Sequence, residues 1–163
     1  MNGQPNYITA AGYQALKTEY ENLFKQERPK LVETISWAAG NGDRSENGDY
    51  IYGRKKLREI DRRLNFLSRR MKAAKVIDPA QQEDRSRVLF GATVTIADED
   101  DEHRTVTLLG EDEADASQGR ISWRSPLANA LKRAGIGDVR TVLLPAGPKD
   151  YEIIAIEYPG ETS

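Results

Sequence analysis

The hydrophobic residues in the first part of the chain recur at helical spacing. They fall along one face of a long predicted helix at Leu16, Tyr20, Leu23, Leu31, Ile35 and Ala38. Thr9 is a suitable N-cap, because its hydroxyl can accept a hydrogen bond from a backbone N–H of the first turn. Pro29 lies within the pattern, where it removes one backbone donor and crowds the carbonyl of Lys25. We therefore expect an amphipathic helix that bends near Arg28 and continues beyond it.

A second helical pattern has the spacing of a coiled coil. Its apolar residues follow one another at steps of 3, 4, 3, 4 and 3, at Leu57, Ile60, Leu64, Leu67, Met71 and Ala74. Only a short acidic and glycine-bearing stretch, residues 42–50, separates this pattern from the first. The two apolar seams can bury each other if the helices form an antiparallel hairpin, with arms of about 45 Å for some 30 residues each.

The second half of the chain reads as strands around one short helix. Strand-like segments, rich in β-branched residues, are residues 88–90, 93–96, 105–109, 141–144 and 151–158. The helix is expected over residues 126–134, with Ser125 as N-cap, Pro126 in the first turn and Gly135 at the end. Residues 98–102, a run of five acids, are expected to form a solvated turn between two strands. The predicted fold class is α+β: an N-terminal antiparallel coiled-coil hairpin (1–78), a polar linker (79–87) and a C-terminal domain with a small antiparallel sheet (88–163).

Composition narrows the chemistry. The chain has 163 residues, 31% of them charged, and neither a long apolar run nor a signal-peptide pattern, so we expect a cytoplasmic protein without membrane contact. It has no cysteine, which excludes disulfides and thiolate metal sites. A single histidine, His103, argues against an imidazole metal cluster.

Charge is divided unevenly between the halves. Residues 1–78 carry 15 basic and 10 acidic side chains, and residues 79–163 carry 9 basic and 16 acidic ones. The second helix holds most of the excess, in Arg54, Lys55, Lys56, Arg58, Arg62, Arg63, Arg69, Arg70 and Lys72. One interpretation is a solvated face balanced by acids of the first helix; the other is a phosphate-binding face for single-stranded nucleic acid.

The turn between the helices also has two interpretations. Asp43 and Glu46 are spaced like an acidic capping box at the start of the second helix. Alternatively, their carboxylates could hold a hard divalent cation such as Mg²⁺, which prefers oxygen ligands. Two carboxylates would bind this ion weakly alone, so a partner would have to supply the remaining ligands.

The turn and its flanks resemble the bacterial transcript-cleavage factors of the Gre family, most closely the GreB type. The resemblance covers residues 7–158 and is carried by Trp37-Ala38-Ala39, Gly42-Asp43-Arg44-Ser45-Glu46-Asn47, Asp49-Tyr50 and Leu57-Arg58-Glu59-Ile60-Asp61-Arg62-Arg63. Gly48 and Gly53 depart from the pattern, where alanine and asparagine are more usual. Because glycine costs up to about 1 kcal/mol in a helix, we expect a mobile first part of the second helix.

The resemblance implies a monomeric elongation factor that is not itself an enzyme. Its hairpin would enter the secondary channel of backtracked bacterial RNA polymerase and stimulate cleavage of the nascent RNA. Asp43 and Glu46 would complete a Mg²⁺ site shared with the polymerase active centre, Ser45 would help to position the reacting groups, and the free protein would hold no ion stably. The RNA 3′ segment would lie on Arg54, Lys55, Lys56, Arg58, Arg62, Arg63, Arg69 and Arg70.

The C-terminal half resembles the Gre C-terminal domain, whose fold is similar to FKBP-type prolyl isomerases. The matching residues are Ser125-Pro126-Leu127-Ala128, Ala130-Leu131, Gly137-Asp138 and Pro145-Ala146-Gly147. Ser125 and Pro126 are the implied docking residues for a coiled coil of the polymerase β′ subunit, and Arg124 departs from an acid in the family pattern. Two alternatives stay open: a channel-blocking inhibitor without cleavage activity, and a prolyl isomerase, although the aromatic residues for an isomerase pocket are few.

Overall fold

The computed structural model describes residues 5–40 and 48–160, which form two compact units. Among the described residues, one unit combines residues 5–12 with residues 74–160, and the other comprises residues 13–40 and 48–73. The first strand therefore groups with the C-terminal part of the chain, whereas the sequence suggested a boundary at residues 79–87. In the described residues, no helix combines the length and the apolar character needed to cross a membrane.

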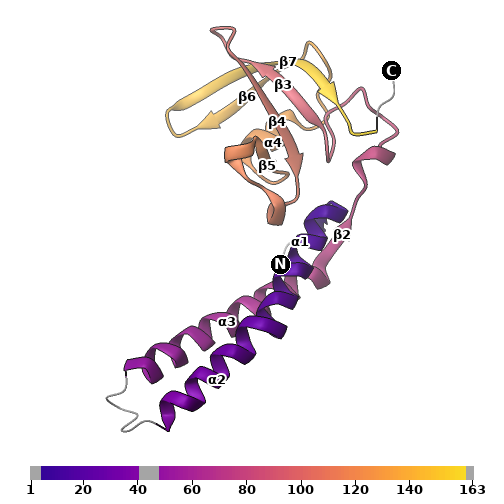
Figure 1. The fold of residues 1–163 in the computed structure, drawn as a ribbon. Coiled ribbons are helices and arrows are strands. Elements are labelled where there is room, and N and C mark those ends of the chain that lie inside the picture. The colour runs from indigo at the N-terminus through magenta and orange to yellow at the C-terminus, as the bar shows by residue number, and fades with distance from the viewer. Residues whose placement is uncertain (1–4, 41–47, 161–163) are drawn as a thin grey trace. The chain divides into compact units, whose positions relative to one another are not determined.

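The helical unit is an antiparallel pair. Helix α1 (Ala10–Asn22) continues through a π-helical turn (Leu23–Glu27) into α2 (Arg28–Ala39), and α3 (Gly48–Ala73) runs back alongside α2 (Figure 1). The backbone N–H of Arg28 donates to the carbonyl of Leu23, an i to i−5 bond that defines the π turn. The expected disturbance by Pro29 thus takes the form of one wide turn just before the proline, and the helix does not stop.

The apolar seams meet as the spacing predicts. Ile60, Leu64 and Leu67 are buried on α3, and Ala38 is buried on α2. Gly53 is buried as well, and a Cβ atom built on it would lie 2.7 Å from Cγ1 of Ile35. This glycine allows close approach of the two helices, a packing role that helix propensity alone does not reveal.

The C-terminal unit is built on a five-stranded sheet in the order β5-β4-β3-β7-β6 (Figure 1). Its strands are β3 (Thr93–Ala97), β4 (His103–Leu109), β5 (Arg120–Ser122), β6 (Val139–Leu144) and β7 (Gly147–Glu157). Three neighbouring pairs are antiparallel, and β5 is parallel to β4 with Thr107 opposite Arg120. The expected antiparallel sheet is therefore mixed, because two short 3₁₀ turns (Glu111–Glu113 and Ala116–Gln118) bring the chain back so that β5 runs parallel to the last three residues of β4.

Short helix α4 (Pro126–Leu131) packs its buried face against this sheet. The Ser125 hydroxyl accepts a hydrogen bond from the Ala128 N–H at 3.2 Å, which confirms the predicted N-cap. The helix ends at Leu131, short of the expected residue 134. Val88 and Phe90 are buried, but residues 88–90 form no strand; instead Val88 exchanges backbone hydrogen bonds with Ala134 and Arg133.

A small parallel pair, β1 (Asn6–Ile8) with β2 (Ala74–Val76), was not predicted. It is tied to the larger sheet by Glu113, whose carboxylate accepts from the backbone N–H groups of Thr9 and Gly110, each at 2.9 Å. Thr9 also caps α1, because its hydroxyl accepts from the Gly12 N–H at 3.1 Å. The chain is closely packed here: a Cβ on Gly110 would lie 2.2 Å from the Tyr7 carbonyl oxygen.

Candidate functional site: a basic hairpin and a docking cavity

The three predicted catalytic residues, Asp43, Ser45 and Glu46, lie outside the described residues. The described helices on either side of them are α2, which ends at Ala39, and α3, which begins at Gly48. The capping and the metal-binding interpretations both stay predictions. Within residues 5–40 and 48–160, no cluster of three or more His, Asp or Glu side chains could hold a metal ion.

The predicted RNA-binding residues divide into groups by their position on α3. Four of them are exposed at steps of 3, 4 and 7 along the helix face opposite the buried seam, and we call these the outer basic row: Lys55, Arg58, Arg62 and Arg69. In the described part of the chain, none of the four takes part in a hydrogen bond or an ion pair. Their charges are therefore available to an external anion.

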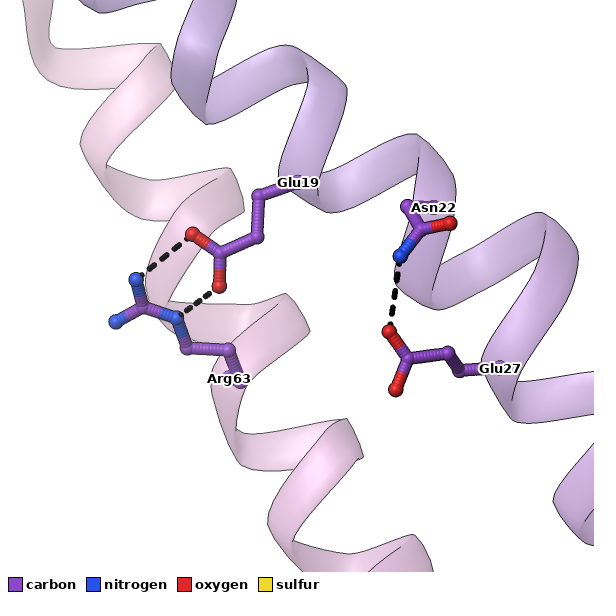
Figure 2. A network of polar contacts seen from close by, with 4 residues as sticks. All are labelled: Glu19, Asn22, Glu27 and Arg63. Atoms are coloured by element: carbon purple, nitrogen blue, oxygen red, sulfur yellow. Dashed lines mark hydrogen bonds and ion pairs between the residues drawn. The ribbon is translucent and has the colours of Figure 1, made fainter.

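Arg63 belongs to a different environment. Its guanidinium binds the Glu19 carboxylate through two hydrogen bonds of 2.6 and 2.9 Å, and Figure 2 shows this fork across the helix pair. The guanidinium also lies 5.1 Å from the ring centre of Phe66. The hydrogen bond from Arg63 lowers the pKa of Glu19, against a smaller opposing effect of burial. Because this charge is compensated within the hairpin, Arg63 is the weaker of the predicted RNA contacts.

The opposite flank of the hairpin is held by a second ion pair. Arg28 on α2 donates to Asp61 on α3 at 2.8 Å, and this bond raises the pKa of Arg28. Near the start of α3, the Arg54 guanidinium lies 3.1 Å from the Tyr50 hydroxyl. Figure 2 also shows Asn22 donating to Glu27 at 2.9 Å, across the π turn.

The predicted docking residues Ser125 and Pro126 lie together at one cavity of the C-terminal unit. The cavity has a volume of about 270 Å³ and an apolar lining from Ile121, Leu127, Val142, Leu144 and Tyr151, with Arg104 also present. Pro126 is exposed at its rim, whereas the Ser125 hydroxyl is occupied as the N-cap of α4. Ser125 therefore shapes the rim, and Pro126 is exposed on it; the docking role of both residues stays a prediction.

Arg124 and Trp123 lie next to this rim. The Arg124 guanidinium lies 3.4 Å from the Pro5 carbonyl oxygen, and Trp123 packs against the core as expected. The Lys132 ammonium lies 4.2 Å from the centre of the Trp123 ring. Burial first, and the nearby Arg124 and Arg133 second, lower the pKa of Lys132.

Sequence reasoning missed two exposed aromatic residues near the end of the hairpin. Trp37 is 65% exposed and Tyr52 is 66% exposed, although residues of this size are usually more buried. The signal was present in the spacing, because Trp37 falls outside the apolar series of Leu31, Ile35 and Ala38. A large aromatic residue off the apolar stripe of an amphipathic helix is predicted to face solvent.

A basic two-helix hairpin joined to a small α+β unit agrees with the comparisons to known proteins. The family model for the N-terminal region of transcription elongation factors matches residues 6–76, and the GreA/GreB C-terminal model matches residues 82–158. The chain belongs to the GreA/GreB family of transcription elongation factors.

Several curated relatives are named GreB. GreB of Neisseria meningitidis serogroup B is 51% identical over 153 residues, which cover 94% of both chains. GreB of Yersinia pestis is 45% identical over 153 residues, covering 94% of this chain and 89% of that protein. Within the family, the chain is therefore of the GreB type, as the turn motif suggested.

Two solved structures are also similar over most of the chain. The structure of the transcription factor Gfh1 shares 20% identity, with 96% and 99% of the two chains covered and a TM-score of 0.46. The GreA/GreB factor from Nitrosomonas europaea shares 20% identity, with 93% and 98% covered and a TM-score of 0.42.

Proposed function

We propose that this protein binds RNA polymerase stalled in a backtracked state and stimulates cleavage of the nascent RNA. The hairpin enters the secondary channel and carries Asp43 and Glu46 to the active centre. The polymerase performs the cleavage, and elongation resumes from the new 3′ end. The observation that carries this proposal is an acidic turn at the end of a basic helix pair, in a chain of the GreB type.

The helix pair is held together by contacts between its own helices, as a hairpin that extends into a channel requires. Its two flanks are fixed by ion pairs, Arg28 with Asp61 and Arg63 with Glu19, and its seam is closely packed at Gly53. A thin helix pair buries little surface per residue, so these contacts hold the register that sets where the turn is presented.

The outer basic row accounts for the grip on RNA. Extruded RNA is a single-stranded polyanion, and sequence-independent binding to it requires cations that are not already paired. Lys55, Arg58, Arg62 and Arg69 meet this requirement within the described residues. The C-terminal unit contributes docking, for which the apolar cavity beside Pro126 is the candidate contact with the β′ coiled coil.

The donor set of the turn fits Mg²⁺, since Asp43 and Glu46 offer carboxylate oxygens and no soft ligand. When bound, the ion supplies activation of water and stabilisation of charge on the phosphodiester. The role of this chain is to bring two carboxylates, with Ser45 between them to orient the reacting groups. The capping interpretation of Asp43 and Glu46 is compatible with this role, because the two carboxylates can cap the helix in the free protein and bind the ion in the complex.

A transcript-cleavage assay on a stalled elongation complex tests the proposal. The native protein should shorten the RNA from its 3′ end. Asp43→Asn and Glu46→Gln keep the size of each side chain and remove its charge, so each should abolish stimulated cleavage while binding to polymerase is retained. Cleavage that survives both substitutions contradicts the assignment. Binding without cleavage by the native protein would instead identify a channel-blocking inhibitor.

A further inference from the structure

The two exposed aromatic residues near the end of the hairpin lie at matched positions. Gly53 of α3 is directly against Ile35 of α2, and Arg28 pairs with Asp61, so residues whose numbers add up to 88 or 89 face each other across the pair. Trp37 and Tyr52 satisfy this relation. They therefore lie at the same level of the hairpin, about one turn from the end of each helix.

Both residues also lie on the same flank. Trp37 is nine residues after Arg28, and Tyr52 is nine residues before Asp61. Nine residues are about two and a half helical turns, which places each ring on the side opposite the Arg28–Asp61 ion pair. Trp37 and Tyr52 thus lie on one flank at the same level of the hairpin, 65% and 66% exposed, and we call them the aromatic pair.

Charge indicates what covers the aromatic pair. Helix α3 carries nine basic and three acidic side chains, and Lys55 and Lys56 follow Tyr52 by three and four residues, which places them one turn along the helix. In the described part of the chain, neither lysine has a hydrogen-bond or ion-pair partner. Exposed rings bordered by unpaired cations are the arrangement by which proteins hold single-stranded nucleic acid, with bases on the rings and phosphates on the cations.

We infer that Trp37 and Tyr52 form a stacking platform for unpaired bases of RNA, an inference that rests on the proposed function. The phosphates follow Lys56 and the outer basic row, which begins at Lys55, while one or two bases turn onto the rings. Stacking tolerates any base, because every base has a π face, and so suits a factor that acts at any sequence.

Binding to two kinds of polymerase complex tests the platform. One complex is backtracked and has an extruded RNA 3′ segment; the other holds its RNA 3′ end in the active register and has none. All proteins carry Asp43→Asn, so that the extruded RNA stays intact. Trp37→Ala and Tyr52→Ala should each weaken binding to the backtracked complex by about 5- to 30-fold, in the range for loss of a stacked base. Binding to the complex without extruded RNA should change less than 2-fold.

Matched variants separate stacking from other causes. Trp37→Phe and Tyr52→Phe keep a ring and should bind nearly as the parent does, whereas Trp37→Leu keeps apolar bulk without a ring and should fail. Phe24→Ala removes another exposed aromatic residue, 52% exposed and stacked on Tyr20 away from the pair, and should have no effect.

Three outcomes would overturn the inference or its basis, and they are distinguishable. Equal weakening with both complexes would show that the rings touch polymerase protein. Unchanged binding of Trp37→Ala and Tyr52→Ala to backtracked complexes would show that they touch nothing there. Failure of the Asp43→Asn parent to bind either complex would instead refute the proposed function.

Discussion

The two glycines near the start of α3 should respond oppositely to alanine. Gly48 begins the helix, and a Cβ built on it meets nothing within 4 Å. Gly48→Ala therefore removes backbone freedom from the unfolded chain without a clash, and we expect a gain in hairpin stability of at most about 1 kcal/mol. Gly53→Ala gains the same helix propensity but places its methyl group 2.7 Å from Cγ1 of Ile35.

The clash at Gly53 is costly because the atom it meets cannot easily move. Cγ1 of Ile35 is close to the backbone of α2, and a β-branched side chain in a helix has one strongly preferred χ1 rotamer. Either Ile35 leaves this rotamer or the helices separate, and overpacking of this kind typically costs about 1–3 kcal/mol. After subtraction of the propensity gain, Gly53→Ala should destabilise the helix pair by up to about 2 kcal/mol.

Amide hydrogen exchange measured along α2 and α3 checks this pair of variants, because it reports the helical unit separately from the sheet. Faster exchange around Ile35 and Ile60 is expected for Gly53→Ala, and equal or slower exchange for Gly48→Ala. Ile35→Ala removes Cγ1, the atom that the new methyl group meets, so Gly53→Ala should cost little stability when it is introduced into the Ile35→Ala variant. If the amides of Gly53→Ala exchange as slowly as those of Gly48→Ala, the helices are not closely packed at Gly53 and the reasoning is refuted.

Three further predictions concern the ion pairs, the outer basic row and the helix cap. Glu19→Gln should lower the free energy of unfolding of the hairpin by up to about 1 kcal/mol at neutral pH, the range for exposed ion pairs. The pKa of Glu19 in the folded protein lies below its ordinary value of 4.5, so this loss of stability should be seen above that value. In urea unfolding at different pH values, it should disappear as the pH falls through the folded pKa. Arg62→Glu should slow rescue of complexes with long extruded RNA and reduce the salt dependence of binding, whereas Lys30→Glu, the same charge change on exposed α2, should not; equal effects would mean that net charge alone matters. Ser125→Ala should lower the stability of the C-terminal unit by about 1 kcal/mol through loss of the cap on α4, and Ser125→Asp should restore it in thermal unfolding, unless the hydroxyl has another role.

The helical half of the fold could be predicted because its signals are local. Steps of three and four placed Ile60, Leu64 and Leu67 in one seam, and the structure buries all three. Thr9 and Ser125 were recognisable as caps from residue type and position alone. The family followed from the turn motif, which the comparisons confirm.

The features that were missed depend on contacts between residues distant in the sequence. Gly53 was interpreted as a point of mobility, because propensity describes one helix and says nothing of Ile35 across the seam. The segment containing Val88 has the residues of a strand, but its backbone pairs with Ala134 and Arg133 at the end of α4. Strand β1 was missed because it is only three residues long and its partner β2 lies 68 residues away in the register.

The candidate site was predictable only in its residue types. The sequence identified every basic residue on α3 but could not separate Arg62 from Arg63. Arg62 is unpaired among the described residues, whereas the charge of Arg63 is compensated by Glu19. That distinction depends on which side of α3 faces the first helix and on the register between them. The exposure of Trp37 and Tyr52 depends on the same geometry, although the spacing of Trp37 already placed it off the apolar stripe.

The most direct test of the account is the length of the RNA in a backtracked elongation complex after addition of this protein. The native protein should release a 3′ fragment and leave a shortened transcript that polymerase can extend. Glu46→Gln should leave the transcript intact while competing with the native protein for the complex. An intact transcript with the native protein bound, or a shortened one with Glu46→Gln, would contradict the role given to the acidic turn.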